Sequence, residues 1–133
     1  MQDPYLSQRM NRNRLLADLA QYGRLLIAFD FDNTVFDCHK LGYEFPELEE
    51  VLRKAKVLNH HLILFTCRED IELAEAINYC RERGYEPDSV NGSPIYPDNT
   101  KPYYNILLDD RAGLQSAYLD LLWILNEQLK LEV

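Results

Sequence analysis

Three short apolar runs in this chain each end on a reactive polar side chain, and this recurrence most constrains the fold. The runs cover residues 25–29, 62–65 and 106–108, and they are followed by Asp30, Thr66 and Asp109. Apolar runs without alternation are typical of strands that are buried on both faces, as in a parallel sheet covered by helices. We therefore predict an α/β fold, a single Rossmann-like domain with a mostly parallel sheet flanked by helices.

The segments around these runs show helical periodicity. We expect an N-terminal helix within 1–23, a core over 24–112 and a C-terminal helix over 113–131, all within one domain of residues 1–133. Pro46 predicts the start of one crossover helix, and apolar spacing before Gly84 predicts another. A short, weakly marked third strand is expected near 88–91. Neither interval between these elements is long enough for a separate cap domain, so only loops, chiefly 38–45 and 91–100, are expected to cover a site.

Parallel sheets bind ligands outside the carboxyl ends of their strands. The residues that follow the predicted strands should therefore meet in one crevice, although they are far apart in sequence. These residues are Asp30, Asp32, Thr66, Asp109 and Asp110.

This set of side chains suits phosphoryl transfer. Of two carboxylates placed two residues apart, one can attack phosphorus and the other can act as acid and base. A hard divalent cation with oxygen ligands would screen the repulsion between the carboxylates and the phosphate. Thr66 and Lys101 would supply fixed donors to the phosphate oxygens.

The motifs and their order resemble the haloacid dehalogenase superfamily of phosphohydrolases, in a small capless form. The resemblance covers 24–112 and consists of Asp-x-Asp-x-Thr at 30–34, Thr66 after an apolar run, Lys101, and an acidic pair at 109–110 after another run. It implies that Asp30 is the nucleophile, that Asp32 is the acid and base, and that Thr66 and Lys101 hold the phosphate.

The resemblance also implies a Mg²⁺ site. The ion would be held by the Asp30 carboxylate, the Asp32 main-chain carbonyl and Asp109, with Asp110 in direct or water-mediated support. One departure from the family pattern is Asn33, where many members carry Gly; Asn tolerates positive φ better than other non-Gly residues.

Each of these residues also has a purely structural interpretation. Asp30 and Asp32 could end a strand and cap a following helix, Thr66 could cap the next helix, and Lys101 could be a solvated charge. Two further residues are candidates for substrate binding: Asn91, in a polar and proline-stiffened loop that could equally be an ordinary connection, and Arg68. Arg68 could grip a second phosphate or a carboxylate on the substrate, or pair with acidic residues of its own helix.

Charge and cysteine content limit the classes of partner. The net charge is −8, without a long run of basic residues, so no broad nucleic-acid surface is expected. Three cysteines without a close pair favour reduced thiols and a cytoplasmic location. The apolar runs are too short to span a membrane. We expect a small phosphorylated substrate, such as a metabolite or a nucleotide.

The sequence thus predicts a Mg²⁺-dependent phosphomonoester hydrolase that acts through an aspartyl-phosphate intermediate. The alternative is a catalytically idle or phospho-accepting binding or signalling module on the same fold. The last helix carries apolar residues on more than one stripe, including Leu119 and Trp123. Either the N-terminal helix or a second copy of the chain, in a homodimer, should cover them.

Overall fold

The three apolar runs form three of the four strands of a parallel sheet. The computed structural model describes residues 3–131, with β1 at Leu26–Asp30, β2 at His61–Phe65 and β4 at Ile106–Leu108. The fourth strand is the two-residue β3, Ser89–Val90, at the weakly marked position. The strand order is β3-β2-β1-β4 and every pair is parallel, which confirms the α/β prediction.

The strand order brings two carboxyl ends together at the centre of the sheet. Strand β1 pairs with β2 on one side and with β4 on the other, with Asp30 beside Phe65 and Phe29 beside Leu108. The chain moves outward from β1 through β2 to β3 and then returns to the other side of β1. This reversal is the topological switch point, where α/β sheets bind their ligands.

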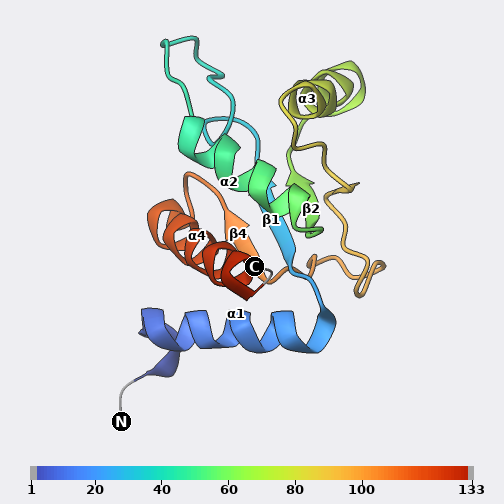
Figure 1. Ribbon diagram of the computed structural model, residues 1–133. Helices are drawn as coiled ribbons and strands as arrows, with labels where there is room; N and C mark the ends of the chain where they lie inside the picture. Colours follow the sequence, from blue (N-terminus) through green and yellow to red (C-terminus); the bar gives the residue numbers. More distant parts are fainter. Residues whose placement is uncertain (1–2, 132–133) are drawn as a thin grey trace.

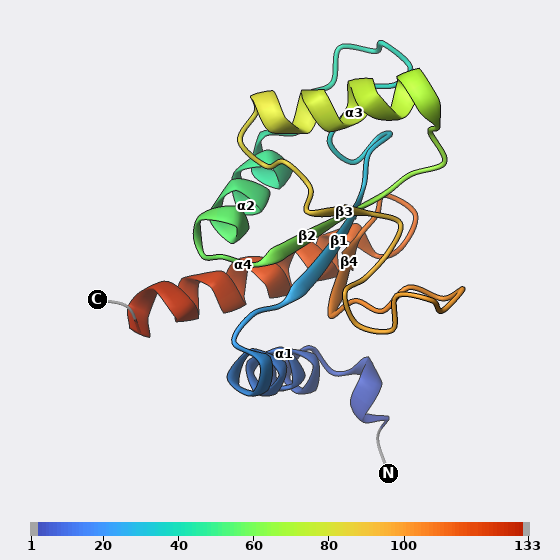
Figure 2. The same cartoon turned by 90° about the vertical axis from the view of Figure 1, so that its right-hand side faces the viewer.

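Within residues 3–131, four α-helices accompany the sheet (Figures 1 and 2). They are α1 (Gln8–Tyr22), α2 (Pro46–Val57), α3 (Asp70–Glu82) and α4 (Leu114–Leu131), and a 3-10 turn, η1 (Pro4–Leu6), precedes them. The Ser7 side chain caps α1 by accepting the Met10 N–H, and Gly23, at φ 77°, ends the helix in the left-handed conformation. Helix α2 begins at the proline that predicted its start. None of the helices within residues 3–131 is long and apolar enough to cross a membrane.

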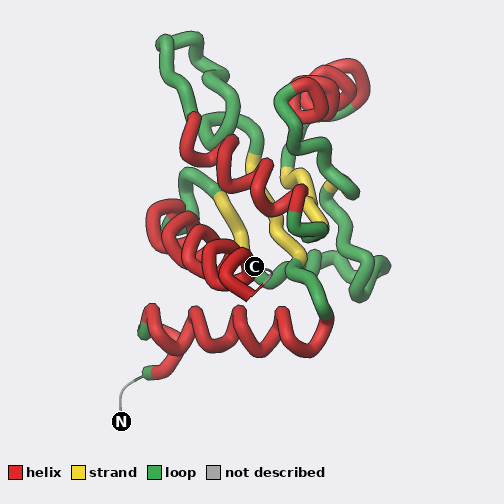
Figure 3. Tube along the Cα trace, in the orientation of Figure 1, coloured by secondary structure: helices red, strands yellow, loops and turns green. Residues whose placement is uncertain are grey.

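The two faces of the sheet are covered differently. One face carries Ile27, Phe29 and Leu64 and packs against buried side chains of all four α-helices. The other face, with Leu26, Ala28 and Ile63, packs instead against the segment that connects β3 to β4. Figure 3 shows this connection as loop rather than helix. The sheet is flanked by helices as predicted, and on this second face Ile95, Tyr103 and Tyr104 of the connection provide the apolar cover.

Helix α1 lies against α4, below the sheet in Figures 1 and 2. Asp120 of α4 is almost fully buried and accepts hydrogen bonds from the side chains of Asn11 and Arg12. The Arg12 guanidinium also lies 5.4 Å from the centre of the Trp123 ring. Of the two covers predicted for the last helix, the N-terminal helix or a second copy of the chain, the N-terminal helix lies over Trp123. Leu119 remains exposed.

Candidate functional site

Three carboxylates meet at the switch point. Asp30 ends β1, and Asp109 and Asp110 follow β4 directly, so the register of the two strands brings these residues side by side. One oxygen atom from each carboxylate lies within 4.8 Å of the others. The predicted convergence of the first and last acidic motifs is therefore present in the structure.

Thr34 joins the two acidic motifs. Its hydroxyl oxygen accepts the Asp110 N–H at 3.1 Å and lies 3.4 Å from the Asp110 carboxylate and 3.5 Å from the Asp30 carboxylate. The side chain is fully buried. Sequence reasoning included Thr34 in the first motif but assigned it no role. In the structure it fixes the position of the loop after β4 relative to the loop after β1.

The chain after Asp30 forms a tight turn instead of starting a helix. The N–H groups of Thr34, Val35 and Phe36 all point to the Phe31 carbonyl, and the Phe36 carbonyl accepts the Asn33 N–H at 2.8 Å. Asn33 adopts φ 63°, the left-handed conformation that Asn tolerates. Because α2 begins only at Pro46, neither Asp30 nor Asp32 caps a helix.

Burial and the two neighbouring carboxylates destabilise the ionised form of Asp30. Loss of solvent, followed by repulsion from Asp109 and then by a hydrogen bond and repulsion from Asp110, raises the pKa of Asp30 to about 7. The cluster thus concentrates negative charge that a cation would relieve.

Asp32 is held by Arg68. The guanidinium donates to both carboxylate oxygens, from Nη2 to Oδ1 at 2.8 Å and from Nε to Oδ2 at 3.2 Å. The cation also lies 4.9 Å and 5.2 Å from the ring centres of Phe31 and Phe36. Its hydrogen bonds to the Asp32 carboxylate raise the pKa of Arg68. The sequence offered the acidic residues of its own helix as partners of Arg68, but the ion pair forms with Asp32, which is 36 residues away.

Thr66 and Asn91 are joined at the ends of β2 and β3. The Asn91 side-chain carbonyl accepts the Thr66 N–H, and its amide donates to the Thr66 carbonyl, both at 2.9 Å. The Thr66 hydroxyl accepts the Arg68 N–H at 3.1 Å and does not cap α3, whose N-cap residue is Glu69. Asn91 was predicted to bind substrate, and in this structure its side chain holds the main chain of Thr66.

A hollow of about 400 Å³ opens beside the carboxylates. Its lining consists of Asp30, Phe65, Thr66, Cys67, Asn91, Thr100, Pro102 and Asp109. The loop 91–100 therefore contributes to the hollow as predicted, whereas no residue of the loop 38–45 lines it. The apolar members Phe65 and Pro102, together with Cys67, carry no motif by which the sequence could have identified them.

Lys101 lies between two residues that line the hollow but is not itself part of the lining. Its side chain is exposed and forms no hydrogen bond or ion pair with any residue among 3–131. The role of Lys101 as a phosphate ligand stays a prediction.

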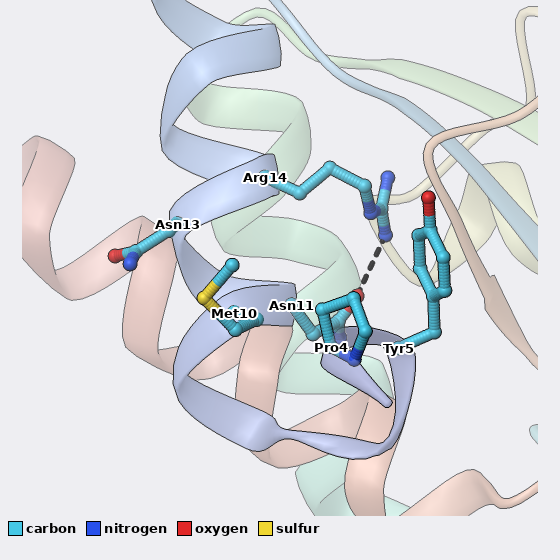
Figure 4. A pocket seen from close by; sticks show the side chains of 6 residues that line it. All are labelled: Pro4, Tyr5, Met10, Asn11, Asn13 and Arg14. Carbon is cyan, nitrogen blue, oxygen red and sulfur yellow. Dashed lines mark hydrogen bonds between the residues drawn. The ribbon is translucent and has the colours of Figure 1, made fainter. Parts of the chain in front are cut away.

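Another hollow, of about 490 Å³, lies at the N-terminal end of the chain. Figure 4 shows its lining by η1 and α1, with Arg14 donating a hydrogen bond to the Asn11 side chain. None of its lining residues is a carboxylate or a residue of the predicted site. This hollow therefore offers no acidic group for the predicted chemistry.

The fold and the site together define a class: an α/β protein whose all-parallel sheet carries a three-carboxylate cluster at its switch point. Among solved structures the chain is similar to a conserved protein of Bacteroides thetaiotaomicron, with 33% identity and a TM-score of 0.56. The similarity covers 68% of this chain and 78% of that one. The chain belongs to the family of this conserved protein. No protein-family model matches the chain, and no curated protein matches it.

Proposed function

We propose that the protein is a Mg²⁺-dependent phosphomonoester hydrolase that acts through an aspartyl phosphate on Asp30. The observation that carries the proposal is the meeting of Asp30 with Asp109 and Asp110 beside an open hollow at the switch point. This arrangement supports the resemblance to haloacid dehalogenase phosphohydrolases, because the first and last motifs of that family would have to act on one phosphate.

The cluster fits a hard divalent cation. Its donors are carboxylate oxygens within 4.8 Å of one another, and such oxygens are the ligands that Mg²⁺ prefers. Burial, and after it repulsion from Asp109 and Asp110, raises the pKa of Asp30, and a bound cation would offset both effects. Asp30, Asp109 and Asp110 would hold the ion with the main-chain carbonyl of Asp32. When bound, Mg²⁺ would neutralise the charge that the nucleophile and the phosphate bring together.

In the first step a carboxylate oxygen of Asp30 forms a bond to phosphorus as the bond to the ester oxygen breaks. Asp32, with one of its two oxygens released from the pair with Arg68 and protonated, donates that proton to the departing oxygen. In the second step Asp32 takes a proton from water and the water oxygen bonds to phosphorus. The bond between phosphorus and the Asp30 oxygen breaks, which regenerates the Asp30 carboxylate and releases inorganic phosphate. Thr66 and Lys101 would donate hydrogen bonds to the remaining phosphate oxygens.

The alternative is a module that binds or accepts phosphate without turnover. The second carboxylate of the first motif, Asp32, favours the hydrolase, because a module that only accepts phosphate needs no acid for a departing oxygen. Acetyl phosphate distinguishes the two, since a phospho-accepting module would retain label on Asp30 without releasing phosphate continuously.

The test is hydrolysis of p-nitrophenyl phosphate by the parent protein with Mg²⁺ and with EDTA. We expect turnover only with Mg²⁺, and we expect Asp30→Asn to lose at least a thousandfold in kcat because it removes the nucleophile. Glu75→Gln, at an exposed position on α3, is the matched control and should keep the parent rate. Parent-level turnover by folded Asp30→Asn would contradict the covalent mechanism.

A further inference from the structure

The guanidinium of Arg68 has one edge engaged and one edge open. Nε and Nη2 face the two oxygens of Asp32 and form a bidentate pair. A guanidinium has a second bidentate edge, made by Nη1 and the remaining Nη2 hydrogen. No side chain or main-chain group of residues 3–131 accepts a hydrogen bond from that edge.

The surroundings hold Arg68 in a fixed orientation. Phe31 and Phe36 stack on each other with ring centres 4.8 Å apart, and both lie against the guanidinium. The bidentate pair with Asp32 sets the rotation of the charged plane. About a fifth of the Arg68 side chain, 21%, remains exposed to solvent. An ordered, partly desolvated guanidinium with an open edge is a typical receptor for a carboxylate or a phosphate.

We infer that Arg68 binds a second anionic group on the leaving group of the substrate. This inference rests on the proposed function, because the position of the leaving group follows from the role of Asp32. If Asp32 protonates the ester oxygen, Arg68 lies one hydrogen bond beyond that carboxylate. Hydrogen bonds of about 2.8 Å would link the ester oxygen to Asp32, Asp32 to Arg68, and Arg68 to the second anion. This series places the second anion within roughly 10 Å of the ester oxygen. The substrate class is therefore small phosphate monoesters that also carry a carboxylate or a second phosphate.

The test uses two sets of matched substrates. In the first, ω-carboxyalkyl phosphates with one to four methylene groups are compared with their carboxamides, which have the same shape without the charge. In the second, alkanediol bisphosphates are compared with the monophosphates of the same diols. The ratio of kcat/KM within each pair measures recognition of the second anion and separates a carboxylate from a phosphate.

We expect the parent protein to prefer the anionic member of at least one pair by roughly tenfold or more, since charge-assisted hydrogen bonds discriminate to that extent. The preference should appear mainly in KM. In Arg68→Gln the ratio should fall to about one, and in Arg68→Lys, which keeps the charge but lacks the second edge, it should be intermediate. The matched control is Arg53→Gln, at an arginine of α2 that pairs with Glu50, and it should retain the parent ratio.

The outcomes separate this inference from the proposed function. If p-nitrophenyl phosphate is hydrolysed in an Asp30-dependent manner but no anionic member is preferred, the inference on Arg68 is overturned and the hydrolase stands. The same holds if Arg68→Gln lowers every rate equally and leaves the ratios unchanged, because Arg68 would then only position Asp32. Absence of hydrolysis of every ester overturns both.

Discussion

Replacement of Asp30 by Asn should stabilise the metal-free protein at alkaline pH. In the folded protein the pKa of Asp30 is raised from 3.8 to about 7, first by burial and then by Asp109 and Asp110. A group whose folded pKa is raised contributes stability below its unfolded pKa, and this contribution is lost as pH rises through the folded pKa. The parent should therefore lose stability between about pH 4 and pH 8, and Asp30→Asn should not share this loss.

The size of the effect follows from the pKa and from the position of the side chain. A rise from 3.8 to about 7 corresponds to roughly 4 kcal/mol for a group fully shielded from water. Asp30 is only half-buried, so solvent screening reduces the expected difference to about 1–2 kcal/mol. Urea unfolding followed by circular dichroism, in EDTA at pH 5 and pH 8, measures it. The pKa values of His61 and Asp88 are also shifted, but both residues are present in the parent and in the variant. Their contributions therefore cancel when the free energy of unfolding of the parent is subtracted from that of the variant.

A substitution outside the carboxylate cluster serves as the control for the stability of Asp30→Asn. Glu75→Gln, outside the cluster, should change stability equally at both pH values. Mg²⁺ should stabilise the parent at pH 8 and have little effect on Asp30→Asn, because binding to the folded state adds stability. If Asp30→Asn is no more stable than the parent at pH 8 in EDTA, the carboxylates do not repel one another as described.

Two further predictions concern the supports of the site and of α1. Thr34→Val should cost about 1–3 kcal/mol in urea unfolding and weaken stabilisation by Mg²⁺, because the Asp110 N–H loses its acceptor; Thr34→Ser, which keeps the hydroxyl, should retain most of both. Arg12→Ala should shift the fluorescence of the single tryptophan, Trp123, to longer wavelength and destabilise the fold by about 1–3 kcal/mol. The exposed Arg9→Ala should leave the emission unchanged, and an unshifted spectrum in Arg12→Ala would show that α1 does not cover the ring.

The sheet could be predicted from the sequence because its strands are continuous apolar runs. The same pattern located Asp30, Thr66 and Asp109, since strand ends in a parallel sheet share one edge. The short strand β3 was only weakly marked because two residues carry almost no periodic signal. The covering of one face by a loop was missed, because Ile95, Tyr103 and Tyr104 form no regular pattern.

The side-chain partners within the site were harder to predict. The pair between Asp32 and Arg68 joins residues 36 positions apart, and the pair between Thr66 and Asn91 joins residues 25 apart. Such partners depend on how β1, β2 and β3 are placed relative to one another, which motif spacing does not encode. Local backbone conformation was easier to predict, because it depends on residue type: Asn33 adopts the positive φ that Asn tolerates.

The connection between β3 and β4 covers one face of the sheet and also supplies Asn91, Thr100 and Pro102 to the hollow. Because a loop with few regular hydrogen bonds opens more readily than a packed helix, this part of the protein should undergo local unfolding without global unfolding. Amide hydrogens beneath it, such as that of Leu26, which donates to the Asn105 side chain, would then exchange with solvent by this local route. A ligand in the hollow would hold the connection in place and slow the exchange of these amide hydrogens. Binding at the carboxyl end of β1 could then be followed by hydrogen exchange at Leu26, at the other end of the strand.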